Sequence, residues 1–264
     1  MIMPSSITNL TAEPCEGGIV LNWDVPADSC LSYVRVSYMN PRTGQYIRKN
    51  SSVYKDTLLI DGLLAKDGEY TFEVVPVSST ETCGTALTIS AKALPVQPIV
   101  TTLSDMLVLT AENLYCNNPD PEEGKDIGFL VDGNTNNFFH TNWHDTGTEP
   151  HYIDFTLPKP VDFFEIKSFY RGGRFGQCPI EITVLGSNDD GATWETIAEI
   201  EDDGSGGSSF RTPVLGVEGK TYSMVRYRAD RTSNDAVFFA LAEMEFYAVS
   251  FVIYDPEGIY TPGE

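Results

Sequence analysis

Oxygen-bearing side chains and aromatic rings crowd into one short segment of this chain, Phe129 to Trp143. An Asp132-Gly133-Asn134 turn lies near its start, and the glycine lets the backbone curl so that neighbouring carbonyls converge. Hard oxygen donors at a tight turn suit Ca²⁺, which takes about six to eight oxygen ligands. Aromatic and imidazole groups follow directly, as a sugar-binding face requires. The segment therefore predicts a binding module rather than a catalyst.

The charge of the chain narrows the choice of ligand. Its 264 residues include 17 Lys and Arg against 38 Asp and Glu, which gives a net charge of −21. Such an acidic surface repels phosphate backbones and anionic headgroups, so we expect no nucleic-acid binding and no membrane insertion. It is compatible with neutral ligands and with cations. The length and the hydrophobic fraction of 41% allow two folded domains.

Cysteines and apolar runs bear on the cell compartment. No CxxC pair occurs among the five cysteines, so a thiolate zinc site is not predicted. A disulfide such as Cys15–Cys83 is compatible with the sequence, although small buried thiols are the expectation for most. No apolar run reaches the roughly twenty residues of a membrane span. Either the protein is intracellular or its export segment is missing from this sequence. We expect the latter, and hence a bacterial cell surface or the periplasm.

Short strands with alternating apolar residues dominate the chain, and Gly, Pro, Asn and Asp separate them. Apolar side chains at every second position place one face on a core and the other in water. This pattern predicts an all-β protein with two β-sandwich domains in tandem. Two prolines in Ala93–Pro98 indicate a stiff connector. The predicted divisions are a first domain at 1–96, a second at 97–250 and a C-terminal tail at 251–264.

The first domain resembles a fibronectin type III domain. The resemblance rests on the strand Ile19–Trp23, on Leu59–Leu63 and on Glu69–Val74. It implies that Trp23 lies in the core and that the hydroxyl of Tyr70 returns to backbone upstream. The family's proline-containing loop before this tyrosine is replaced by Leu64–Gly68. The implied role is that of a spacer or docking platform.

The second domain resembles an F5/8 type C (discoidin-like) domain, related to the family 32 carbohydrate-binding modules. The motifs that carry the resemblance are Val131–Asn134 with Phe139–Trp143, Pro150–Leu157, Phe164–Arg174, Glu181–Trp194 and Leu241–Phe246. The expected fold is a jelly-roll sandwich. Trp194, which follows an Asp-Gly turn, is expected in the core of a hairpin.

The resemblance also implies a structural Ca²⁺ next to the binding loops. Asp132 and Glu243 would supply carboxylates, and Asn137 stands where the family often has threonine. Two carboxylates with neutral oxygens would nearly neutralise the ion. The alternative is a plain turn at Asp132 and a surface residue at Glu243, and Glu245 is a nearby competitor. The complete predicted ligand set is Phe129, Asp132, Asn134, Asn137, Ala242 and Glu243.

A sugar presents hydroxyls on its edges and C–H groups on its faces, so its site needs aromatic rings beside fixed polar groups. The loops supply such groups in three places. Several alternatives stay open: Trp143 and Phe138 also suit the core, one of Phe238 and Phe239 packs inward, and Tyr170 and Arg171 cannot both face a ligand. The predicted ligand-binding residues are His140, Trp143, His144, Tyr170, Arg171, Arg174, Asn234, Phe238 and Phe239.

These features predict a non-catalytic protein that binds a neutral or galactose-like glycan. One alternative is an adhesion or assembly protein whose loop face binds another surface protein. A further alternative is an accessory fragment of a larger glycoside-degrading enzyme. The adjacent acidic pairs of this chain, such as Glu122 and Glu123, do not place carboxylates on opposite sides of a bond.

Overall fold

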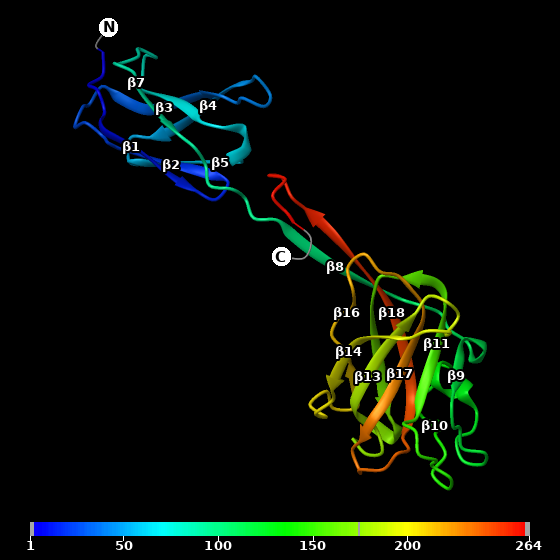
Figure 1. The fold of residues 1–264 in the computed structure, drawn as a ribbon. Helices are drawn as coiled ribbons and strands as arrows, with labels where there is room; N and C mark the ends of the chain where they lie inside the picture. Colours follow the sequence, from blue (N-terminus) through cyan, green and yellow to red (C-terminus); the bar gives the residue numbers. More distant parts are fainter. Residues whose placement is uncertain (1–2, 174, 262–264) are drawn as a thin grey trace. The chain divides into compact units, whose positions relative to one another are not determined.

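The computed structural model describes residues 3–173 and 175–261. The chain divides into two compact units. One unit contains the residues up to Val100 together with those from Ile253 on, and the other is Thr101–Val252. Both are built from antiparallel strands, as Figure 1 shows, which confirms the all-β prediction. None of the helices in the described part has the length and hydropathy of a membrane span.

The first unit is a sandwich of two sheets. One sheet has the strand order β1-β2-β5 and the other β4-β3-β6-β7 (Figure 1). A single 3₁₀ turn precedes β6 in the described residues. The elements are β1 (Thr8–Cys15), β2 (Gly18–Asp24), β3 (Leu31–Met39), β4 (Tyr46–Ser52), β5 (Thr57–Asp61), η1 (Ala65–Asp67), β6 (Tyr70–Ser78) and β7 (Leu87–Ala91).

Two predicted residues hold this sandwich together. Trp23 is buried among the apolar side chains of both sheets, as predicted. Tyr70 is also buried, and its hydroxyl contacts both the N–H (3.2 Å) and the carbonyl (3.4 Å) of Leu64. This contact pins the crossover between the sheets. All five cysteines are free, so the Cys15–Cys83 disulfide is not formed. Burial was expected for most cysteines, but only Cys116 and Cys178 are fully buried.

The second unit is also a sandwich. Its larger sheet has the order β10-β18-β12-β15, with β16 on β12 and β8 on β18, and the other has the order β14-β13-β17-β11-β9. The elements are β8 (Ile99–Met106), η2 (Ala111–Asn113), β9 (Leu114–Cys116), η3 (Ile127–Leu130), β10 (Phe139–His140), β11 (Tyr152–Val161), β12 (Phe163–Tyr170), η4 (Arg171–Gly173), β13 (Pro179–Ser187), β14 (Glu195–Glu201), β15 (Ser209–Arg211), β16 (Leu215–Gly216), β17 (Tyr222–Thr232) and β18 (Ala240–Tyr254).

Alternation along the strands builds the core between these two sheets. In β12 every second side chain is buried, beginning with Phe164. Phe155 of β11 meets Phe246 of β18 across the sandwich with ring centroids 5.5 Å apart. Phe164 stacks on Phe246 within its own sheet, at 5.1 Å. The apolar faces of both sheets therefore pack against each other in the core. Functional residues are expected in the loops at the ends of the sheets.

The segment that follows β18 contacts other residues of the first unit. The carboxylate of Glu257 is buried and accepts hydrogen bonds from the backbone N–H groups of Ala65 (2.8 Å), Lys66 (3.0 Å) and Val96 (3.3 Å). Ala65 and Lys66 lie in the loop that departs from the fibronectin pattern. Burial opposes ionisation, yet these N–H groups hold the pKa of Glu257 below its usual value. The segment predicted as a tail is thus anchored to the first unit.

We expect Glu257→Ala to destabilise the first unit, because it leaves buried backbone N–H groups without an acceptor. The loss is on the order of 1–3 kcal/mol in the free energy of unfolding. Denaturant unfolding at neutral pH measures it, and limited proteolysis should then cut the C-terminal segment sooner. Glu69→Gln, at an exposed carboxylate of the same unit, is the control. Equal stability of the two variants would show that the Glu257 contacts contribute nothing.

Candidate functional site

Three segments meet at one end of the second unit. β10 pairs with β18 through Phe139–Leu241 and His140–Ala240, and Tyr170 at the end of β12 lies opposite Leu241 on the other side of β18. Thr141 ties two of the loops together, because its N–H and its hydroxyl both bond the carbonyl of Phe239. We call this end, with β10, η4 and the loop before β18, the loop face.

The predicted calcium loop is organised around two carboxylates. Glu243, on β18, accepts hydrogen bonds from the N–H groups of Gly133 (2.9 Å) and Asn134 (3.2 Å). Asp132 accepts from Asn134 N–H at 2.9 Å and from the Asn137 amide at 2.6 Å. The structure therefore brings four of the six predicted ligands together. Glu243 is buried, which excludes the alternative that it is a surface residue.

The electrostatics of this loop favour a cation. Burial is the main cause that raises the pKa of Glu243 to about 7, and the negative charge of Asp132 adds to it. The side-chain carbonyl oxygen of Asn137 is buried and has no hydrogen-bond partner in the described residues. Orphaned buried oxygens are rare in folded proteins. One unused oxygen beside two carboxylates is a donor set that fits Ca²⁺.

The backbone around the two carboxylates also suits the predicted calcium site. β18 has a register shift between its pairs Phe169–Glu243 and Tyr170–Leu241, so Ala242 is an extra, bulged residue. A bulged residue is left outside the ladder of hydrogen bonds, which suits a carbonyl ligand. Phe129 lies half-buried in η3, directly before the turn. The competitor Glu245 is engaged elsewhere, with the Tyr247 hydroxyl (2.6 Å) and Lys167 (3.6 Å).

A row of rings and one cation crosses the loop face. The guanidinium of Arg171 lies 3.6 Å from the centroid of the Phe138 ring and bonds the carboxylate of Glu123 at 2.8 Å. Phe138 meets His140 at 6.4 Å between ring centroids, and His140 meets Phe238 at 5.6 Å. Arg171, Phe138 and Phe238 are half-buried. The partner Glu123 was not predicted, because nothing in its local sequence shows that it lies beside Arg171.

Three of the predicted ligand contacts are corrected by the structure. Tyr170 is buried and donates its hydroxyl to Asp202. Phe239 is buried in the core, which leaves Phe238 as the outward ring of that pair. His140 is buried too, and its Nδ1 lies 2.6 Å from the carbonyl of Thr141. Alternation of side chains along β12 turns Tyr170 inward, whereas Phe239 lies directly before β18 and is buried in the core. These three residues support the face and do not present it.

The other predicted ligand-binding residues are accessible, except one that lies outside the described residues. Trp143 is 43% exposed, so it is not a core residue, and its ring packs on that of His144 at 3.8 Å. Asn234 is exposed and accepts from the Thr232 hydroxyl. Arg174 lies outside the described residues. A shallow depression of about 440 Å³ opens beside these loops, lined by Arg171, Gly172, Gly176 and Gln177.

Comparisons with protein families agree with this organisation. Residues 129–224 match the family described as "NedA-like, galactose-binding domain", so the second unit contains an F5/8 type C domain. Residues 4–93 match a "Domain of unknown function (DUF4959)", a separate domain that precedes it. The likeness of the first unit to fibronectin type III stays a prediction. No curated protein matches the chain.

Solved structures with a similar fold include two carbohydrate-binding modules of Clostridium perfringens. CpGH89CBM32-5, in complex with GalNAc-β-1,3-galactose, has 21% identity and a TM-score of 0.45 over 55% of this chain and 100% of that one. The family 32 module of NanJ, in complex with galactose, has 14% identity and a TM-score of 0.44 over 55% and 99%. A SusE-like protein has 16% identity and a TM-score of 0.41 over 92% and 97%.

The raised pKa of Glu243 predicts a pH dependence of the metal-free protein. A carboxyl group whose pKa rises on folding stabilises the fold below its unfolded value and loses this contribution as pH rises. Stability should therefore fall between about pH 4.5 and about pH 7, by on the order of 2–3 kcal/mol. Glu243→Gln should remove this slope. Denaturant unfolding with EDTA across this range tests it, and Glu199→Gln, at an exposed position, should keep the slope.

Proposed function

We propose that this protein is a non-catalytic glycan-binding protein whose loop face holds a neutral or galactose-like sugar. The observation that carries the proposal is the row from Arg171 through Phe138 and His140 to Phe238, within a domain of the galactose-binding family. Partly exposed aromatic rings beside a fixed cation offer a surface for C–H groups and donors for hydroxyls.

The fixed positions of these groups favour recognition. The guanidinium of Arg171 is held by Glu123 and by the Phe138 ring, so little side-chain freedom remains to be lost on binding. Its planar fork can donate to two adjacent hydroxyls. Trp143 and Asn234 are accessible as well. The pairing of Arg171 with a carboxylate and the net charge of −21 disfavour acidic sugars.

A structural Ca²⁺ is the second part of the proposal. Asp132, Asn137 and Glu243 would hold it with the carbonyls of Phe129, Asn134 and Ala242. The ion would neutralise the two carboxylates and fasten the loop that precedes Phe138 to β18. Support comes from the orphaned Asn137 oxygen and from the proximity of the carboxylates. The ion's role is support of the face, with no contact to sugar required.

The setting of the protein follows from the proposed ligand. A glycan binder of this kind would work outside the cytoplasm, on a bacterial cell surface or in the periplasm. The alternative is a protein partner on the same face. It is supported by the exposed apolar side chains Trp143 (43%), Phe175 (42%) and Val237 (40%).

Arg171→Ala and Phe238→Ala should each weaken glycan binding at least about tenfold, since buried contacts of this kind contribute on the order of 1–3 kcal/mol. The measurement is a glycan array followed by calorimetric titration of the best glycan. Lys159→Ala, at an exposed position on β11, should bind like the parent. A folded protein with no ligand on a broad array would count against the sugar and favour a protein partner.

Calcium should raise the melting temperature of the parent protein, and EDTA should reverse the gain, because a ligand of the native state stabilises it by mass action. Asp132→Asn should lose most of this gain, and Glu243→Gln likewise. The gain should grow as pH rises through about 7, where Glu243 ionises. Differential scanning calorimetry checks this. An identical gain in Asp132→Asn would place the ion elsewhere.

A further inference from the structure

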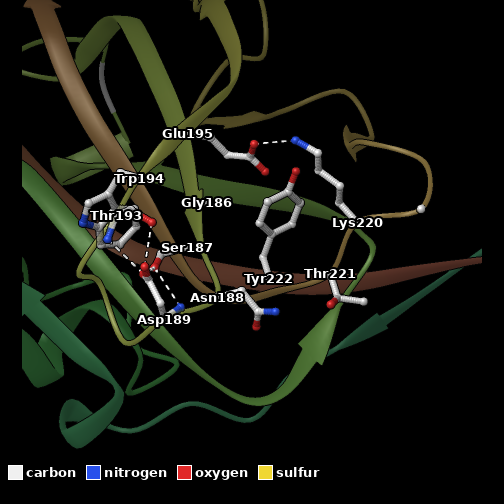
Figure 2. A pocket seen from close by; sticks show the side chains of 11 residues that line it. Gly186, Ser187, Asn188, Asp189, Thr193, Trp194, Glu195, Lys220, Thr221 and Tyr222 are labelled. Carbon is white, nitrogen blue, oxygen red and sulfur yellow. Dashed lines mark hydrogen bonds and ion pairs between the residues drawn. The ribbon is translucent and has the colours of Figure 1, made fainter.

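One cavity of the second unit lies away from the loop face. It measures about 540 Å³ and opens between the β13–β14 hairpin and the turn before β17 (Figure 2). β13 starts near the loop face, where the N–H of Ala240 donates to the carbonyl of Gln177. The strand has nine residues, and the last of them, Ser187, lines the cavity. At roughly 3.4 Å per residue, the two places are about 30 Å apart. We call this cavity the hairpin pocket.

One residue that lines the hairpin pocket has an aromatic ring held by a cation. Trp194 is half-buried rather than a full core residue, and the guanidinium of Arg226 lies 4.2 Å from its ring centroid. Arg226 is itself held by the carboxylate of Asp154 at 2.7 and 2.9 Å and by the ring of Tyr152 at 3.7 Å. The tryptophan is therefore a rigid platform at the pocket.

The other walls are polar. Glu195 and Lys220 form an ion pair, and the exposed side chains of Asn188 and Thr221 also line the pocket (Figure 2). Asp189 is engaged within the hairpin, since it accepts bonds from the Ser187 hydroxyl (2.8 Å) and from Thr193. The polar groups left for a ligand therefore include both donors and acceptors.

A buried hydroxyl in this pocket has no partner. Tyr222 is 2% exposed, and its hydroxyl points toward the Glu195–Lys220 pair but makes no hydrogen bond in the described residues (Figure 2). Burial is the main cause that raises the pKa of Tyr222 to about 12, and the negative charge of Glu195 adds to it. The Tyr222 hydroxyl nevertheless makes no hydrogen bond to the Glu195 carboxylate. The ring is seated against Gly186, where a Cβ would lie 2.2 Å from it. A buried hydroxyl without a hydrogen-bond partner is unfavourable, and a bound ligand that supplied a partner would remove this cost.

We propose that the hairpin pocket is a second saccharide-binding site, which takes one neutral sugar residue stacked on Trp194 and hydrogen-bonded by Tyr222, Glu195 and Lys220. The volume suits a ligand of this size. The three ionised groups Asp189, Glu195 and Lys220 leave a net negative charge, which disfavours acidic sugars. Sites at both ends of the domain would let one molecule join two glycan chains. The inference does not depend on the loop face binding sugar.

The three tryptophans of the chain make the test specific. Trp143 lies on the loop face, Trp194 in the hairpin pocket and Trp23 in the core of the first unit. The full chain labelled with 5-fluorotryptophan gives one fluorine resonance for each. The probes are galactose, N-acetylgalactosamine, glucose and mannose, each titrated to about 0.1 M because small polar sites bind single sugars weakly. We expect saturable movement of the Trp194 resonance with at least one sugar, while Trp23 stays still.

Two matched variants then test the hydroxyl. Tyr222→Phe should weaken the binding reported by Trp194 about tenfold, since a ligand hydrogen bond is lost. Tyr227→Phe removes another buried hydroxyl without a partner, in the core of the same domain, and should bind like the parent. Equal affinities of the two variants would overturn the proposal. So would a Trp194 resonance that no sugar moves, and movement of Trp143 alone would leave the loop-face proposal standing.

Discussion

The arrangement of the loop face depends on one buried carboxylate, that of Glu243. A carboxylate taken out of water must be compensated, because an unpaired buried charge is costly. Here the N–H groups of Gly133 and Asn134 supply part of the compensation, and they lie more than a hundred residues earlier in the chain. The contact fixes the turn on β18. Since Phe138 and His140 follow that turn directly, it also sets where the row of rings begins.

Glu257 plays a comparable part in the first unit. Like Glu243, it is a buried glutamate late in the chain that accepts hydrogen bonds from consecutive backbone N–H groups of a distant loop. The two differ in their surroundings. Burial raises the pKa of Glu243, and the carboxylate of Asp132 adds to this shift and favours a cation. The pKa of Glu257 is lowered, since three N–H groups outweigh its burial. The same side chain therefore serves as a metal-site candidate in one place and as a purely structural anchor in the other.

The two candidate binding places, the loop face and the hairpin pocket, bring their side chains together in different ways. On the loop face, residues from three segments converge because β10 and β12 end there and β18 begins there. In the hairpin pocket, the β13–β14 hairpin and the segment that leads into β17 supply all the groups, and Gly186 makes room for the ring of Tyr222. Both places hold an arginine against an aromatic ring, Arg171 on Phe138 and Arg226 on Trp194. In each, a carboxylate fixes the arginine, so the rings are rigid before any ligand arrives.

The sequence by itself determined the all-β class, and its resemblances implied the core position of Trp23, the backbone contact of the Tyr70 hydroxyl and the type of the second domain. These follow from local alternation and from motifs of short span, which need no knowledge of distant contacts. Only the tertiary structure decided that Tyr170, His140 and Phe239 are buried while Phe238 and Trp143 are accessible. The same holds for the contacts of Glu123, Glu257 and Tyr222, because each joins segments far apart in sequence. Which face of a loop residue meets water depends on what packs beneath it, and that is set by strand pairing between remote parts of the chain.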